Sequence, residues 1–258
     1  MLRKNISSII IFLCLVAMLL SGLCIFAILG DYHAGETTYE NLHIYVSPPL
    51  ASSDIILPFE EPDKQSLAIP TVDFDALKQI NKDVIAWIQI PGTRIDYPIL
   101  QGTDNTFYLN HMIDKAWNRC GSIFMDCRSS PDFSDLNTII HGHHMGNGSM
   151  FEDLTLYKSQ AFWDEHPYGF IMTPKESYIL VFYAGSLVSV SSDLWRINFT
   201  GSDDYNNWIT SSLSAANVHG NFIPSYLDHI VTLSTCSYEF HEARWLLQGI
   251  LLPASNLH

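Results

Sequence analysis

Two short segments of the chain concentrate side chains that can carry out chemistry. In the first, an apolar run leads into residues 141–144, which are His-Gly-His-His. In the second, the apolar run 229–235 leads into Cys236, and Arg244 follows at the head of another apolar run. A strand end suits catalysis because the scaffold fixes the backbone while the side chain faces an opening.

Cysteine, histidine and arginine together suit acyl transfer through a thioester. The thiolate is the nucleophilic form of cysteine, and it is a minority species near neutral pH when the thiol is unperturbed. An imidazole can take the thiol proton, and a guanidinium can stabilise charge on a carbonyl oxygen. Each residue also has a plainer interpretation. Cys236 alone could be a buried structural thiol, and Arg244 could form a surface ion pair with Glu239 or Glu242.

The three histidines allow a different class of site. His141 and His143 alternate along a predicted strand, so they point to one face and could bind zinc. Histidine-rich motifs of zinc hydrolases add an aspartate shortly afterwards, whereas residues 145–147 here are Met-Gly-Asn. We therefore expect no metal and no cofactor. A zinc-dependent hydrolase that uses His141, His143 and His144 is kept as an alternative.

The segments that must position these residues are mostly predicted strands. Seven runs are rich in Val, Ile, Tyr and Phe: 84–90, 97–101, 122–126, 137–140, 177–184, 229–235 and 244–252. Seven or eight such strands with little intervening helix indicate an all-β sandwich or barrel. Acidic starts and apolar residues at helical spacing predict a short helix over 73–81 and a helix inserted between strands over 202–216.

The amino terminus has the composition of a membrane anchor. Arg3 and Lys4 precede an almost unbroken apolar stretch over residues 9–29, long enough to span about 30 Å of hydrocarbon. A secretory signal peptide is the competing interpretation, but its apolar region is usually shorter and ends at a small-residue cleavage site. Basic residues before the span and acidic residues after it predict a single-pass protein of the cell membrane whose catalytic domain is extracellular.

The chain therefore divides into three predicted parts. Residues 1–30 form a cytoplasmic stub and transmembrane anchor, residues 31–72 form a proline-containing extracellular stalk, and residues 73–258 form the catalytic domain. The formal net charge of −14, with only 13 Lys and Arg, disfavours nucleic acid as a partner, because that binding relies on basic side chains. Cys120 and Cys127 flank a predicted strand that holds them too far apart to bridge, and are interpreted as small buried residues.

The residues around Cys236 resemble the signature of the sortase family. Residues 232–236 are Thr-Leu-Ser-Thr-Cys and Arg244 follows, which resembles the Thr-Leu-x-Thr-Cys and downstream Arg pattern of sortases. Four upstream segments are similar to class B members: 96–101 (Asp-Tyr-Pro-Ile-Leu-Gln), 104–109 (Asp-Asn-x-x-Tyr-Leu), 121–126 (Gly-Ser-Ile-Phe-Met-Asp) and 142–151, where Gly-His is followed by Met and by Asn-Gly-Ser-Met-Phe. The resemblance runs from about residue 73 to 252.

This resemblance implies both a fold and a reaction. The fold is a closed sortase-type β-barrel of about eight strands, with amino-terminal helices and a long helix before the cysteine strand, which corresponds to residues 202–216. The reaction is transpeptidation: a sorting signal near the carboxyl end of a secreted protein is cut after a threonine, and the acyl group is held on the cysteine. The acyl group then passes to an amine of a peptidoglycan precursor or of a pilin lysine. Sorting motifs of the Asn-Pro-x-Thr and Leu-Pro-x-Thr types both fit the resemblance.

Carried over residue by residue, the resemblance makes Cys236 the nucleophile, His143 its proton-transfer partner and Arg244 the oxyanion stabiliser. Four further positions correspond to residues that line the site or contact the sorting peptide: Asn105, Leu109, Ser234 and Thr235. A non-catalytic surface-binding or scaffold protein, which keeps the barrel without turnover, is the alternative from a different class.

One departure from the family pattern concerns the histidines. Family members commonly have Tyr-Gly-His-Asn where residues 141–144 are His-Gly-His-His, so His141 and His144 crowd the predicted catalytic imidazole. If His144 lies in the cleft, a second titrating imidazole disfavours charge on the first and shifts the pH optimum downward.

Overall fold

The computed structural model describes residues 2–48 and 68–256 of the chain. The strands of these residues are β1 (Val46–Ser47), β2 (Thr71–Val72), β3 (Val84–Gln89), β4 (Asp96–Leu100), β5 (Ile123–Met125), β6 (Asn137–His141), β7 (Tyr168–Met172), β8 (Ser177–Ser189), β9 (Val218–His219), β10 (Ile230–Cys236) and β11 (Ala243–Pro253). The α-helices are α1 (Leu2–Glu40), α2 (Phe74–Ile80), α3 (Gln160–Glu165) and α4 (Ser202–Ala215). Short 3₁₀ helices are η1 (Asn41–Tyr45), η2 (Phe107–Leu109), η3 (Glu152–Lys158), η4 (Asp193–Trp195) and η5 (Ala254–Asn256).

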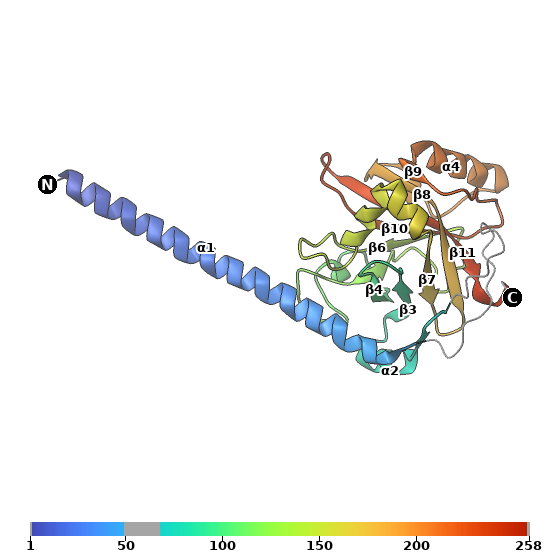
Figure 1. The fold of residues 1–258 in the computed structure, drawn as a ribbon, viewed down its shortest axis with the longest axis horizontal. Coiled ribbons are helices and arrows are strands. Elements are labelled where there is room, and N and C mark those ends of the chain that lie inside the picture. Colours follow the sequence, from blue (N-terminus) through green and yellow to red (C-terminus); the bar gives the residue numbers. More distant parts are fainter. Residues whose placement is uncertain (1, 49–67, 257–258) are drawn as a thin grey trace.

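Eight strands of the described residues close into a barrel (Figure 1). They follow the order β11-β10-β6-β5-β4-β3-β7-β8, and β8 pairs again with β11 to complete the ring. Neighbouring strands are antiparallel except for β4 with β5 and β6 with β10, which are parallel. The two-residue strand β9 adds to β8 outside this ring. The predicted closed barrel with an amino-terminal helix and an inserted helix is therefore confirmed.

The strands near the site are nearly continuous apolar runs because both of their faces are covered. On β11, Trp245 and Leu247 belong to the barrel core, whereas Leu246 and Ile250 belong to a second apolar layer. Helix α4 supplies the other side of that layer through Tyr205, Trp208 and Ile209. The period of two along each strand thus sends alternate side chains into the barrel and under α4.

One barrel strand, β7, is absent from the predicted strands. Its five-residue run directly follows Pro167 and contains Gly169, and both residues are turn signals in a sequence. The strand exists because β3 and β8 pair with it on either side. Its place in the barrel is set by partners that are distant in the sequence.

Helix α1 continues well past the predicted membrane span (Figure 1). Residues 31–45, which were expected to begin an irregular stalk, are helical, and β1 then pairs with β2. Most of the proline-bearing segment, residues 49–67, lies outside the described residues. The apolar part of the helix is long and hydrophobic enough to cross a membrane.

The carboxyl-terminal part of α1 packs against the barrel through specific contacts. Asp31 forms an ion pair with Arg119, with 2.6 Å between Oδ2 and Nε. Tyr39 is buried; its hydroxyl donates a hydrogen bond to the carbonyl oxygen of Gly121 at 2.8 Å. Its ring meets Tyr97 edge-on at 5.4 Å. These contacts join the end of α1 to the barrel.

The two cysteines around β5 differ in exposure. Cys120 is buried beside α1 and Cys127 is exposed, and both are free thiols. The interpretation of both as buried residues is therefore right for Cys120 and wrong for Cys127. Cys127 lies in the turn after β5, where its backbone N–H donates to the Asn105 carboxamide. Burial, followed by the charge of Asp31, raises the pKa of the Cys120 thiol to about 11.

We expect Tyr39→Ala to lower the unfolding free energy of the barrel by about 3–5 kcal/mol, the range for removal of a buried aromatic side chain. The measurement is denaturant unfolding of the full chain in detergent, followed by tryptophan fluorescence. Ile44→Ala is the matched control, because Ile44 is 77% exposed and its removal should change the free energy by less than about 0.5 kcal/mol. Equal effects of the two substitutions would show that the end of α1 is not part of the folded unit.

Candidate active site

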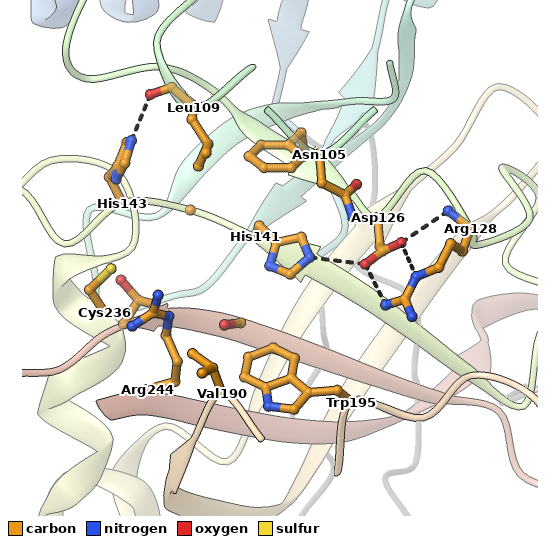
Figure 2. A pocket seen from close by; sticks show the side chains of 14 residues that line it. Asn105, Leu109, Asp126, Arg128, His141, His143, Val190, Trp195, Cys236 and Arg244 are labelled. Carbon is orange, nitrogen blue, oxygen red and sulfur yellow. Dashed lines mark hydrogen bonds and ion pairs between the residues drawn. The ribbon is translucent and has the colours of Figure 1, made fainter. Parts of the chain in front are cut away.

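A cavity of about 430 Å³ opens at the ends of β6 and β10 (Figure 2). It is lined by Asn105, Leu109, Phe124, Asp126, Arg128, His141, Gly142, His143, Val190, Trp195, Ser234, Thr235, Cys236 and Arg244. All seven residues that the sequence analysis singled out as catalytic or substrate-binding are in this set. The structure thus brings together segments that lie more than a hundred residues apart in the chain.

Cys236 and Arg244 are fixed relative to one another by the pairing of two strands. They are register partners at the end of the antiparallel pair formed by β10 and β11, and their side chains lie at the same end of the cavity (Figure 2). The Arg244 guanidinium donates through Nη1 to the carbonyl oxygen of Ala243 at 2.9 Å. Among the described residues, Arg244 has no carboxylate partner within ion-pair distance, so the interpretation as a surface ion pair is not realised.

The loop that joins β10 to β11 is tied down beside the cysteine. Lys158, at the end of η3, donates to the Ser237 hydroxyl at 3.0 Å and forms an ion pair with Glu239. Its ammonium also lies 5.5 Å from the centre of the Trp245 ring, a cation–π contact. These contacts hold the loop immediately after Cys236 and occupy Glu239, one of the two carboxylates expected near Arg244.

His143 follows β6 and is held by a backbone carbonyl. Its Nε2 lies 2.6 Å from the carbonyl oxygen of Leu109, and because a carbonyl can only accept, Nε2 carries the proton. Figure 2 shows the ring between Leu109 and Cys236, with the Cys236 sulfur pointing to the side of the cavity where His143 lies. The contact therefore fixes which nitrogen of a neutral His143 is free to take a proton.

The residue before His143 must be glycine for this arrangement. A Cβ atom at Gly142 would lie 2.5 Å from Ile123 and 2.6 Å from the ring of Phe151, closer than real Cβ contacts. The Gly142 N–H also donates to the carbonyl oxygen of Ser234 on β10 at 3.0 Å. The backbone around Gly142 therefore runs close to both the barrel core and the cysteine strand.

His141 lies further along the same cavity and has an acidic partner that the sequence analysis did not identify. Its Nε2 is 3.3 Å from Oδ2 of Asp126, a carboxylate that also accepts from Nε and Nη2 of Arg128 at 2.9 and 2.8 Å. Burial by itself would raise the pKa of Asp126, but the donors, led by Arg128 and His141, hold it well below its usual range. Asp126 ends the Gly121–Asp126 motif noted in the sequence, so the residue was visible there but its partners were not.

The four predicted substrate-binding residues all reach the cavity, in different ways. The Asn105 carboxamide accepts from the backbone N–H of Cys127 at 2.8 Å and helps to lower the pKa of Asp126, so its polar atoms support the cavity wall. Leu109 presents a side chain that is 39% exposed, besides the carbonyl that holds His143. Ser234 and Thr235 are almost fully buried next to Cys236.

His144 is not among the residues that line the cavity, although its ring reaches the backbone of Cys236, and its predicted effect on the pH optimum stays a prediction. Its ring meets Tyr238 edge-on at 5.1 Å, and its buried Nδ1 has no hydrogen-bond partner among the described residues. Burial, followed by the charge of Lys158, lowers the pKa of His144 below its ordinary value of 6.5. With His141 on Asp126 and His143 on Leu109, the three histidines do not converge on a common point, and no group of three potential metal ligands occurs in the described part of the chain.

Comparisons with known proteins agree with this fold. Residues 88–251 match the profile of the sortase domain. Sortase B of Listeria monocytogenes is 36% identical over 180 residues, which cover 68% of this chain and 72% of that protein. Sortase B of Staphylococcus aureus is 32% identical over 169 residues, covering 66% and 69%.

Solved structures of sortase B enzymes have a similar fold. The 2.0 Å crystal structure of Staphylococcus aureus sortase B superposes with a TM-score of 0.66 at 31% identity, covering 70% of this chain and 86% of that chain. A sortase B from Bacillus anthracis superposes with a TM-score of 0.72 at 27% identity, covering 88% and 100%.

The chain belongs to the sortase family. Its relatives by sequence and by structure are class B sortases, and it is a cysteine transpeptidase of that class.

We expect the unfolding free energy to fall as the pH drops from 7 to 5.5, with part of this fall due to His144. A pKa that is lower in the folded protein means that the unfolded chain binds the proton more tightly, so stability is lost as the pH falls below 6.5. His144→Asn should make the unfolding free energy less dependent on pH between 7 and 5.5. His241→Asn, at an exposed position, should leave this pH dependence unchanged. The measurement is the urea midpoint against pH, and parallel curves for all three proteins would contradict the expectation. Protonation of the Asp126 carboxylate lowers the unfolding free energy only at more acidic pH, below the ordinary pKa of 3.8 for this group.

Proposed function

We propose that this sortase is anchored in the cell membrane and cleaves a sorting signal near the carboxyl end of secreted proteins, passing the acyl group through a thioester on Cys236 to an amine. The observation that carries the proposal is the grouping of Cys236, His143 and Arg244 at one end of a single cavity. Cys236 stands at a strand end, Arg244 is its register partner, and His143 is oriented by Leu109.

In the first half of the proposed reaction, His143 takes the proton of the Cys236 thiol, and the resulting thiolate attacks the carbonyl carbon of the threonine before the scissile bond. Negative charge then develops on the carbonyl oxygen, and the Arg244 guanidinium, which has no carboxylate partner among the described residues, donates an N–H to it. The tetrahedral intermediate collapses when His143 gives a proton to the departing amine. The carbon–nitrogen bond breaks, the thioester remains, and His143 is left neutral.

In the second half, an acceptor amine attacks the thioester. Neutral His143 takes the proton that the amine loses, Arg244 again stabilises the oxyanion, and the carbon–sulfur bond breaks to regenerate the thiolate. A new amide links the acyl group to the acceptor. The reaction exchanges one amide for another, so it needs no cofactor and no external energy source.

Two solved relatives indicate the chemical classes of the partners. A Staphylococcus aureus sortase B has been solved as a substrate complex, and a sortase B has been solved in a complex with triglycine. Their similarity to this chain, with TM-scores of 0.66, supports a peptide donor and an amine acceptor here. The acceptor is a peptidoglycan precursor or a pilin lysine.

The amino-terminal helix supports the proposed location. Residues 1–30 form the cytoplasmic stub and membrane anchor, residues 31–72 connect it to the barrel, and residues 73–258 form the catalytic domain. The apolar side chains of α1 from Ile10 to Leu29 are largely exposed, as expected for a surface that faces lipid. The basic residues before this stretch and the acidic ones after it favour an extracellular catalytic domain.

Cys236→Ala should abolish both cleavage of a sorting peptide and formation of a covalent acyl-enzyme, because it removes the only atom proposed to carry the acyl group. Arg244→Ala should lower kcat by about 10²–10³-fold, the usual cost of removing an oxyanion donor. Peptide cleavage and intact-protein mass spectrometry measure the two effects. Unchanged turnover by Cys236→Ala would exclude the thioester route, and absence of turnover by the unmodified enzyme on every peptide of a library would favour the non-catalytic scaffold.

An added amine should divert the acyl group from water. With a cleavable sorting peptide, triglycine or a lysine-containing peptide should yield an amide product at the expense of the free acid, because an amine is the stronger nucleophile toward a thioester. Liquid chromatography of the products, with and without each amine, measures the partition. Release of free acid alone, whatever amine is offered, would contradict transpeptidation and indicate a simple peptidase.

A further inference from the structure

His141 lines the cavity but takes no part in the proposed transfer. It is the last residue of β6, its side chain is 23% exposed, and its ring is stacked near Trp195 at 6.1 Å with an interplanar angle of 18°. Figure 2 shows it between the Cys236 end of the cavity and the end formed by Asp126 and Arg128. A polar ring at this position faces whatever fills the cavity.

The partner of His141 is a carboxylate that stays charged. The Asp126 side chain is 2% exposed, and a buried carboxylate without donors would take up a proton. Here it accepts two hydrogen bonds from the Arg128 guanidinium and one from the Arg128 backbone N–H. These donors are part of the fold and are present whether or not a peptide is bound.

A charged carboxylate selects one tautomer of the imidazole beside it. Asp126 can only accept, so Nε2 of His141 carries the hydrogen and Nδ1 of the neutral ring is an acceptor. Among the described residues, no hydrogen bond to Nδ1 of His141 is present. In Figure 2 this nitrogen is turned away from Asp126, to the side of the cavity where Cys236 lies.

The part of a substrate that stays on the enzyme must lie in this cavity. Once the thioester has formed, the residues before the scissile bond remain attached to Cys236 while the amine arrives. The cavity extends from Cys236 past His141 to Arg128, so a peptide that leads away from the sulfur passes the free nitrogen of His141. A site with a positioned hydrogen-bond acceptor favours a ligand that brings the matching donor over an analogue that lacks it.

We propose that His141 is a specificity-determining residue, which accepts through Nδ1 a hydrogen bond from an N–H group on the acyl portion of the sorting peptide, and that Asp126 is the positioning residue that sets its tautomer. The inference depends on the proposed function, because it places the peptide on Cys236. It also assigns a role to a departure from the family pattern: a tyrosine hydroxyl can donate or accept, whereas His141 beside Asp126 only accepts until its ring takes a second proton.

The test compares pairs of peptides in the full-length enzyme in detergent. Each N–H group before the scissile bond is removed in turn, by an ester in place of a backbone amide, or by Leu for Asn and Met for Gln. One pair should show a kcat/KM about three- to tenfold higher for the peptide that keeps the N–H, the effect of one neutral hydrogen bond. The ratio within that pair should fall on acidification, because a proton on Nδ1 converts the acceptor into a donor.

The ratio of kcat/KM values within a peptide pair separates the effect of His141 from the effects of the other titratable or charged groups around the cavity. Asp126 and Arg128 face His141 from the turn after β5, and His143, Cys236 and Arg244 line the same cavity from the ends of β6, β10 and β11. Titration of the catalytic groups changes kcat/KM for both peptides of a pair alike, so it cancels. A change in the ratio with pH therefore reports on the contact with the removed N–H group.

Three variants complete the experiment. His141→Phe should bring the ratio to about one at every pH, and Asp126→Asn should reduce it through loss of the fixed tautomer. Val190→Ala is the control that trims the same cavity without removing a polar atom, and it should keep the ratio and its pH dependence. Two results would overturn the role of His141 and leave the proposed function intact. In the first, the unmodified enzyme turns over every peptide pair, but the kcat/KM ratio within each pair does not change with pH. In the second, the ratio rises on acidification. Absence of turnover with all peptides would instead contradict the proposed function.

Discussion

The pairing of β11 with both β10 and β8 is the interaction on which the site depends. β11 is hydrogen-bonded along its length on both edges, which closes the barrel and leaves no free edge between these three strands. Closure sets the register that puts Arg244 opposite Cys236. The apolar layer under α4 covers the outer face of the same strands, so a shift of one residue would expose buried side chains on both faces. The relative position of nucleophile and guanidinium is thus set by strand pairing and by the core.

The second constraint is the parallel pairing of β6 with β10, which puts Ser234 beside His141. It brings the histidine segment to the cysteine strand although the two are almost a hundred residues apart. Polar groups along the cavity are held by neighbouring residues of its wall: Leu109 orients His143, and Arg128 keeps Asp126 charged beside His141. Because these supports are part of the fold, the polar atoms are in place before a substrate arrives, and little reorganisation accompanies binding.

The features of this arrangement that lie within one short segment of the chain could be predicted from the sequence. Cys236 and Arg244 belong to one hairpin, so their motif contains most of their geometry, and seven barrel strands were evident from apolar runs. β7 was not predicted, because Pro167 and Gly169 resemble turn residues and only pairing with β3 and β8 makes a strand of that segment. The contact of His141 with Asp126 was equally inaccessible, since it joins the end of β6 to the turn after β5. The docking of Tyr39 on the barrel depends on tertiary contacts that no helical periodicity encodes.

The rigid attachment of α1 has a geometric consequence for the proposed membrane enzyme. A helix that runs through Glu40 and is pinned by Asp31 and Tyr39 couples the orientation of the barrel to that of its anchor. With a flexible linker, the barrel would rotate freely above the bilayer, and most encounters between the cavity and a substrate would occur in unproductive orientations. The barrel contacts the helix from Asp31 onward, only two residues beyond Leu29, so in the proposed membrane enzyme the barrel lies next to the lipid surface, at 1.5 Å per helical residue. The cavity then searches essentially in two dimensions, which raises the effective concentration of any substrate retained in the same membrane.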